Sequence, residues 1–134
     1  MNTTFSESVP TSRSRVLIVD DDLELRHMVS IVLKKRGWDT VEAGNGREAL
    51  QSLDSSSLPS LILLDLNMPV MDGWEFRKRQ LLDPRIAAVP VVVVSAQGLC
   101  DKTVGLDAKV LRKPLDLSSL IAAVTPFQKP TAPS

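Results

Sequence analysis

The chain has 134 residues, the size of one ordinary domain, and a fold of this length buries about two thirds of the surface of its unfolded chain. With 43% hydrophobic and 24% charged residues, its composition is that of a soluble globular protein. The 16 basic and 16 acidic side chains cancel, which gives no support to a broad nucleic-acid-binding or membrane-binding surface, because both need excess positive charge. Apolar runs such as Ala87 to Val94, which contains Pro90, are far shorter than the roughly 20 residues of a membrane span.

The N-terminal segment and the rare residue types limit the compartment and the chemistry. The segment is rich in Ser and Thr and has no apolar core, so it does not resemble a secretory signal, and we expect a cytoplasmic protein. Cys100 is the only cysteine and His27 the only histidine. An internal disulfide and a multi-thiolate zinc site are therefore excluded, and histidine-based metal or triad chemistry is disfavoured.

Short aliphatic or β-branched runs alternate with segments of helical periodicity, which is typical of an α/β domain with a parallel sheet. The expected strands are Val16 to Val19, Thr40 to Ala43, Leu61 to Leu64, Val91 to Val94, and Val110 with Leu111. The expected helices run from Leu25 to Gly37, from Asn45 past Leu53, from near Trp74 to Asp83, around Lys102 to Leu106, and from Leu117 to Val124. This order predicts a doubly wound five-stranded parallel sheet with helices on both faces. The domain is expected to span residues 14–125, between flexible tails at residues 1–13 and 126–134.

Several polar residues have simple structural interpretations. Asp22 is expected to cap the first helix, and Asn45 with Glu48 three residues on resembles a capping pair. The basic residues 77–79 are expected to form a solvated face. His27 is expected to be an exposed or half-buried helix residue, not a phosphorylated histidine.

Acidic residues follow two of the expected strands. Asp20 and Asp21 come directly after the first strand, and Asp65 comes after the third. In an open parallel sheet these positions share the carboxyl edge, where ligands gather. Carboxylates about 4 Å apart repel by roughly 4 kcal/mol at an effective dielectric constant near 20, so a cation is expected between them. Oxygen ligands without histidine or thiolate favour a hard ion, and few carboxylates with waters suit Mg²⁺, for which Mn²⁺ can substitute.

A hydroxyl and an ammonium group complete this edge. Ser95 follows the fourth strand, and Lys113 follows the fifth. A carboxylate beside Mg²⁺, a hydroxyl and an ammonium group is equipped to accept a phosphoryl group. The metal and the lysine neutralise charge on the phosphoryl oxygens, and the serine donates a hydrogen bond.

The stretches VLIVDDD, LILLDLNMPVMDGWEF, VVVVSA and LRKP resemble, in order and spacing, the motifs of the receiver domain of bacterial two-component response regulators. The resemblance covers roughly residues 14–125 and implies a flavodoxin-like (βα)5 fold in which Asp65 is phosphorylated. It further implies that Asp20 and Asp21 are the acidic pair and that the main-chain carbonyl group of Asn67 binds the metal. Ser95 and Lys113 would contact the phosphoryl group. It also implies a cis peptide bond between Lys113 and Pro114.

Two further segments can be compared with the pattern of the receiver family. Met68, Pro69, Asp72 and Gly73 resemble the loop after the phosphorylation site and are expected to shape that turn. The interval from Ser95 to Lys113 is about one helical turn shorter than usual, so the fourth helix is expected to be short or irregular.

Three other classes of protein share parts of this pattern. A flavodoxin-like electron carrier is disfavoured because three aspartates after the first strand would repel a flavin phosphate. A dehalogenase-type phosphatase also forms an aspartyl phosphate, but its nucleophile follows the first strand and a further acidic pair follows its lysine, where this chain has only Asp116. The remaining alternative is a receiver-like docking module that works without phosphorylation, although it usually lacks one of the acidic or lysine residues.

The sequence therefore predicts a single-domain response regulator and not an enzyme. Asp65 would receive its phosphoryl group from a sensor histidine kinase or a histidine phosphotransfer protein, and the domain would signal by contact with a downstream target protein. About 20 residues follow Lys113, too few for a DNA-binding output domain, so no nucleic-acid or membrane partner is expected unless the chain is a fragment. We expect a monomer or a weak dimer.

Overall fold

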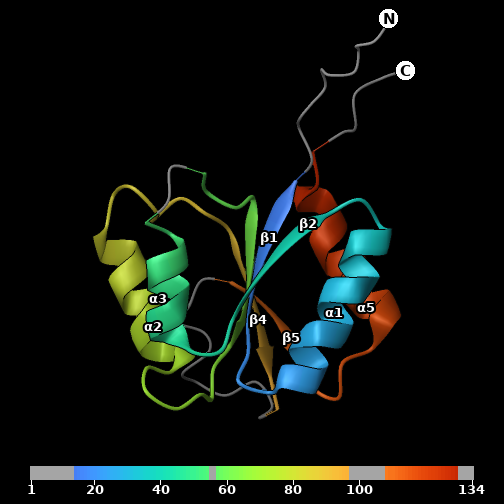
Figure 1. The fold of residues 1–134 in the computed structure, drawn as a ribbon, viewed down its shortest axis with the longest axis horizontal. Coiled ribbons are helices and arrows are strands. Elements are labelled where there is room, and N and C mark those ends of the chain that lie inside the picture. Colours follow the sequence, from blue (N-terminus) through green and yellow to red (C-terminus); the bar gives the residue numbers. More distant parts are fainter. Residues whose placement is uncertain (1–13, 55–56, 97–107, 130–134) are drawn as a thin grey trace, which may run out of the picture.

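The computed structural model describes residues 14–54, 57–96 and 108–129 (Figure 1). They form a five-stranded parallel sheet in the order β2-β1-β3-β4-β5. The strands are β1 Arg15–Val19, β2 Asp39–Ala43, β3 Leu61–Asp65, β4 Val91–Ser95 and β5 Lys109–Arg112. The helices are α1 Leu23–Lys35, α2 Gly46–Ser52, α3 Gly73–Leu82 and α5 Leu117–Val124, and the 3-10 turn η2 Thr125–Phe127 follows. The fourth helix, expected around residues 102–106, lies outside the described residues.

The sheet is covered on both faces, as the sequence predicts. Helices α2 and α3 pack on one face and helices α1 and α5 on the other (Figure 1). Side chains alternate between the two cores: Leu17 and Ile62 belong to the core under α2 and α3, whereas Val16 and Leu61 belong to the other core. Strand β3 is apolar up to its last residue because it is central and buried on both faces.

The strand order reverses between β1 and β3, which makes this pair the topological switch point. The chain passes from β1 outward to β2 and then returns to β3 on the other side of β1. The helices that follow β1 and β3 therefore leave on opposite faces and open a crevice at the carboxyl ends of these strands. The acidic residues 20, 21 and 65 lie at this crevice.

Each of the four described α-helices begins at a capping side chain. The oxygens of Asp22, Asn45, Asp72 and Asp116 accept hydrogen bonds from main-chain N–H groups three residues further on. The caps predicted at Asp22 and Asn45 are confirmed. Glu48 reaches back to the N–H group of Gly44 at 2.7 Å, one residue before the position expected for a capping box.

The Asn45 cap gives a first quantitative prediction. Asn45→Ala removes the acceptor of the Glu48 N–H group, which lies 2.9 Å from Asn45 Oδ1. We expect the free energy of unfolding to fall by about 1 kcal/mol, as measured by urea denaturation. Asn45→Asp keeps an acceptor and should stay close to wild type; equal loss in both variants would contradict the capping role.

The side chain of Arg77 does not lie on the solvated face that the sequence predicts. It is 8% exposed, whereas Lys78 and Arg79 are exposed as expected. Arg77 Nη1 donates to Oε1 of the fully buried Gln80 at 2.8 Å, and Gln80 Nε2 donates to two carbonyl oxygens of the loop before β4. The amide of Gln80 thus provides a buried acceptor for the guanidinium group and joins α3 to that loop.

Residues 126–129 also differ from the expected flexible tail. Phe127 packs against the core under α1 and α5. Gln128 Nε2 donates to the main-chain oxygen of Arg36 at 2.8 Å, and the N–H group of Lys129 donates to Ser14 Oγ at 2.6 Å. These contacts join the end of the described chain to the start of β1 and the end of α1. They involve residues far apart in sequence, which a pattern of prolines and polar residues does not reveal.

Among the residues that the structure describes, the helices are too short or too polar for any of them to cross a lipid bilayer.

Candidate functional site

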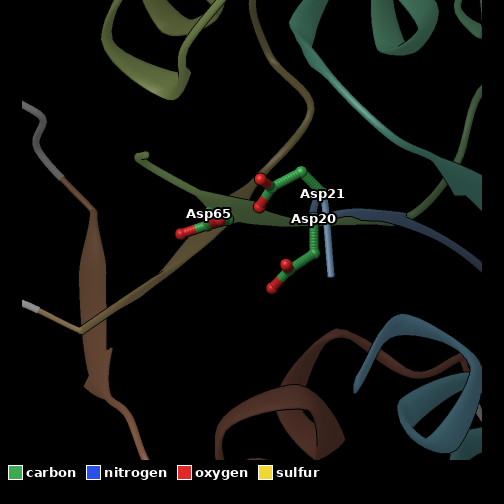
Figure 2. Close-up of side chains that lie close together, drawn as sticks. All are labelled: Asp20, Asp21 and Asp65. Atoms are coloured by element: carbon green, nitrogen blue, oxygen red, sulfur yellow. The ribbon is translucent and has the colours of Figure 1, made fainter. Parts of the chain in front are cut away.

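Three carboxylates gather where β1 and β3 end (Figure 2). Asp20 and Asp21 follow β1, and Asp65 is the last residue of β3. One carboxylate oxygen from each residue lies within 4.8 Å of the others. Asp20 and Asp65 are buried, with exposed fractions of 5% and 3%, whereas Asp21 is exposed. The cluster is therefore open to ligands on the side of Asp21.

Lys113 places a positive charge against the two buried carboxylates. Its Nζ atom lies 2.9 Å from Asp20 Oδ2 and 3.6 Å from Asp65 Oδ1. The main chain fixes the start of this side chain, because the N–H group of Lys113 donates to the carbonyl oxygen of Ser95 at 2.9 Å. Ser95 is the buried last residue of β4. The peptide bond between Lys113 and Pro114 is cis, as the resemblance implies.

The surroundings of Asp65 disfavour its charged form. Burial, and secondly the charge of Asp20, raise its pKa from 3.8 to about 6, although Lys113 acts in the opposite direction. For Lys113, burial works to lower the pKa, but the hydrogen bond and the charge of Asp20, together with Asp65, outweigh it and raise the pKa above its ordinary value. Three carboxylate side chains and one ammonium group thus meet in this site.

This donor set fits a small divalent cation. The three residues with convergent oxygens are all aspartates, and no histidine or cysteine belongs to the cluster within the described residues. Hard oxygen ligands of this kind suit Mg²⁺ or Mn²⁺, which keep several waters in their coordination sphere. Burial, and secondly the charge of Asp20, raise the pKa of Asp65, and a cation there would offset the charge of Asp20.

The loop from β3 to α3 is held close to Asp65 by main-chain contacts. The N–H group of Gly73 donates to the carbonyl oxygen of Leu66 at 3.0 Å. Val70 has a φ of +70°, and the N–H group of Met71 donates to the carbonyl oxygen of Pro69 at 2.8 Å, which is a tight turn centred on Val70. The turn-shaping role predicted for this segment is consistent with these bonds and with the Asp72 cap.

The sequence-predicted site residues come together to different degrees. Asp20, Asp21, Asp65 and Lys113 form one cluster. Ser95 joins it through the main chain at the adjacent strand end. The N–H group of Asn67 lies 3.4 Å from Asp65 Oδ1, and the metal-binding role of its carbonyl group stays a prediction.

One residue of the site was missed by sequence reasoning. Arg26 Nη1 donates to the carbonyl oxygen of Asp20 at 2.7 Å, and Arg26 Nε donates to Glu42 Oε1 at 2.9 Å. Glu42 lies on β2, 16 residues away in sequence. The sequence spacing does not distinguish this arginine from any other in the first turns of a helix. Its hydrogen bond to Glu42 depends on the position of β2 beside β1 in the folded sheet.

Comparisons with known proteins agree with this fold and site. The sequence profile of the response regulator receiver domain matches residues 16–125. The chain therefore belongs to the receiver domain family of two-component response regulators, and the resemblance drawn from its four motifs is confirmed. The doubly wound fold predicted from the strand order is confirmed as well.

Curated relatives include regulators from several bacteria. The chain is 38% identical over 114 residues to the DNA-binding dual master transcriptional regulator RpaA of Synechocystis, an alignment that covers 82% of this chain and 47% of RpaA. It is 38% identical over 115 residues to the CpxR homologue of Haemophilus influenzae, covering 83% of this chain and 48% of that protein. The chain thus spans about half the length of the curated relatives it matches.

Solved structures with the same fold are matched over almost their whole length. The chemotaxis protein CheY4 of Vibrio cholerae superposes with a TM-score of 0.79 at 29% identity, covering 87% of this chain and 99% of CheY4. A response regulator receiver protein from Pseudomonas putida superposes with a TM-score of 0.80 at 31% identity, covering 87% of this chain and 98% of that protein.

Proposed function

We propose that Asp65 accepts a phosphoryl group from a sensor histidine kinase or a histidine phosphotransfer protein, and that the phosphorylated domain signals by contact with a downstream protein. One observation carries this proposal. A buried carboxylate at the end of β3 lies beside two further aspartates and 3.6 Å from an ammonium group. Membership of the receiver family supports the same assignment.

The transfer would use the side chains in distinct roles. An oxygen of Asp65 would form the new bond to phosphorus, while the bond from phosphorus to the donor's histidine nitrogen breaks and the imidazole leaves with its electron pair. Lys113 would neutralise charge on the phosphoryl oxygens, and the Ser95 hydroxyl would donate a hydrogen bond to one of them. Mg²⁺ held by Asp20, Asp21, Asp65 and the carbonyl group of Asn67 would supply further positive charge.

Phosphoryl incorporation from acetyl phosphate tests the proposal without a partner protein. The wild-type protein in MgCl2 should gain the mass of one phosphoryl group in intact-mass spectrometry. Asp65→Asn lacks the nucleophilic carboxylate and should gain none, and Asp21→Asn should gain much less because the metal site is weakened.

A remote aspartate provides the matched control. Asp54 is exposed and pairs with Arg85, away from the carboxyl edge of β3. Asp54→Asn should therefore be phosphorylated like wild type. Chelation of the metal should stop phosphoryl incorporation in both wild type and Asp54→Asn. Full phosphoryl incorporation in Asp65→Asn would show that another residue is the acceptor. No incorporation in wild type under any Mg²⁺ condition would favour the phosphorylation-independent docking module.

The output of the domain is proposed to be protein contact. RpaA is described as DNA-binding, but this chain aligns with only 47% of its length. The cancelling charges of the chain do not favour direct nucleic-acid binding by this domain. Affinity capture with phosphorylated and unphosphorylated protein would identify the partner, which should be retained preferentially by one of the two forms.

A further inference from the structure

Arg26 joins the turn after β1 to strand β2. Its side chain, on α1, is 16% exposed, and its two hydrogen bonds run in different directions, to the carbonyl oxygen of Asp20 and to the carboxylate of Glu42. The position of a Cβ atom built on Gly44 lies 3.4 Å from Arg26 Nη1, so the guanidinium group also lies close to the turn after β2. It thus sits between the ends of β1 and β2, next to the acidic cluster.

The carbonyl group that Arg26 binds belongs to the peptide that joins two residues of the acidic cluster. On one side of this peptide, Asp20 is held by further contacts: its N–H group donates to Ala43, Oδ1 accepts from the Asp22 N–H group, and Oδ2 pairs with Lys113. On the other side lies Asp21, whose side chain is exposed. The plane of the Asp20–Asp21 peptide therefore sets the direction in which the Asp21 side chain leaves the backbone.

We propose that Arg26 is a positioning residue of the metal site. By holding the carbonyl oxygen of Asp20, it fixes the Asp20–Asp21 peptide so that both carboxylates face the same point. Glu42 in turn fixes the guanidinium group, because its bond to Nε leaves Nη1 directed at the peptide. The inference rests on the proposed function in one respect, since it takes this cluster to be the Mg²⁺ site.

Simple electrostatics makes the opposite prediction, which allows a decisive test. Removing a positive charge beside three carboxylates should tighten the binding of a cation. Loss of positioning should weaken it instead. The sign of the change in Mg²⁺ affinity therefore distinguishes a positioning role from a role as a nearby charge.

Two substitutions at this position separate geometry from charge. Arg26→Gln removes the charge and the fork of donors, whereas Arg26→Lys keeps the charge but replaces the two separate donor nitrogens, Nε and Nη1, by a single one. By calorimetric titration with MgCl2, we expect both variants to bind Mg²⁺ about tenfold more weakly than wild type. Arg79→Gln is the matched control, because Arg79 makes a similar 2.7 Å bond to Glu75 on the exposed face of α3, and it should bind like wild type.

A second readout does not involve the metal. The N–H group of Asp22 donates to Asp20 Oδ1 at 2.9 Å, so its hydrogen exchange in metal-free protein reports whether the turn is held. In both Arg26 variants this amide should lose protection, while amides in the centre of β3 stay protected and show that the domain is folded.

The two readouts have separate meanings. Unchanged protection of the Asp22 amide in the Arg26 variants, or Mg²⁺ affinity equal to or tighter than wild type, would overturn the positioning role. If wild-type protein itself does not bind Mg²⁺, the proposed function fails, and the exchange experiment alone decides whether Arg26 holds the turn.

Discussion

Replacing Gly73 by alanine is expected to lower the free energy of unfolding by about 3 kcal/mol or more. A Cβ atom at this position would lie 2.4 Å from the carbonyl oxygen of Asp65 and 2.8 Å from Cα of Leu66. Both atoms belong to the main chain at the end of a fully buried central strand, so neither can turn aside. Either α3 moves away from the sheet or the end of β3 is displaced, and the second outcome also moves the acceptor carboxylate.

A second glycine near the same edge serves as the control. A Cβ atom on Gly44 would meet only side-chain ends, Glu48 Oε1 at 3.3 Å and Arg26 Nη1 at 3.4 Å. The contact with Arg26 Nη1 is ordinary van der Waals contact, and the end of the Glu48 side chain can give by a few tenths of an ångström, so Gly44→Ala should cost less than about 1 kcal/mol. Urea denaturation of the two variants measures the difference. Equal stability of Gly73→Ala and wild type would contradict a close approach of Gly73 to the main chain of Asp65 and Leu66.

The parts of the fold and site that could be predicted share one property: they follow from local pattern and from the geometry of parallel sheets. The apolar run ending in Asp65 predicts a buried strand, and any residue that follows a parallel strand reaches the carboxyl edge. Asp20 and Asp65 could therefore be placed together although they are far apart in sequence. The caps at Asp22 and Asn45 likewise depend only on the neighbouring residues.

The features that could not be predicted depend on which side chain meets which across the tertiary structure. Arg77 is polar and lies beside two basic residues, so its pattern indicates a solvent-exposed face. Its hydrogen bond to the buried amide of Gln80 is not visible in that pattern. Arg26 needs Glu42 on another element, and Lys129 needs Ser14 at the other end of the described chain. Spacing along the chain carries no signal for such pairs.

Without metal at neutral pH, Asp65→Asn is expected to stabilise the domain, although it removes the proposed acceptor. The pKa of Asp65 is raised from 3.8 to about 6 by burial and by Asp20, so the folded protein holds the proton more tightly than the unfolded chain does. The tighter proton binding of Asp65 therefore adds its full contribution to the free energy of unfolding below pH 3.8. This contribution is lost as the pH rises through about 6. A shift of this size corresponds to roughly 3 kcal/mol, which screening by solvent reduces to about 2 kcal/mol.

The stability difference between Asp65→Asn and wild type should thus grow with pH. Urea denaturation in a metal chelator should give nearly equal free energies of unfolding near pH 3.8 and a more stable variant above pH 6. A difference that does not change across this range would mean that ionisation of Asp65 costs the folded protein nothing.

Mg²⁺ should reverse the order of the two proteins. A cation that binds only the folded state stabilises it by RT ln(1 + [Mg²⁺]/Kd), which is about 2.7 kcal/mol at a hundredfold excess over Kd. Wild type offers three carboxylates to the ion, whereas Asp65→Asn offers two and has already lost the repulsion that the ion relieves. Thermal unfolding should therefore show a large rise in the Tm of wild type on addition of MgCl2 and a small rise for the variant. Equal rises in both would place the ion elsewhere, because a site that includes Asp65 must lose affinity when this carboxylate becomes an amide.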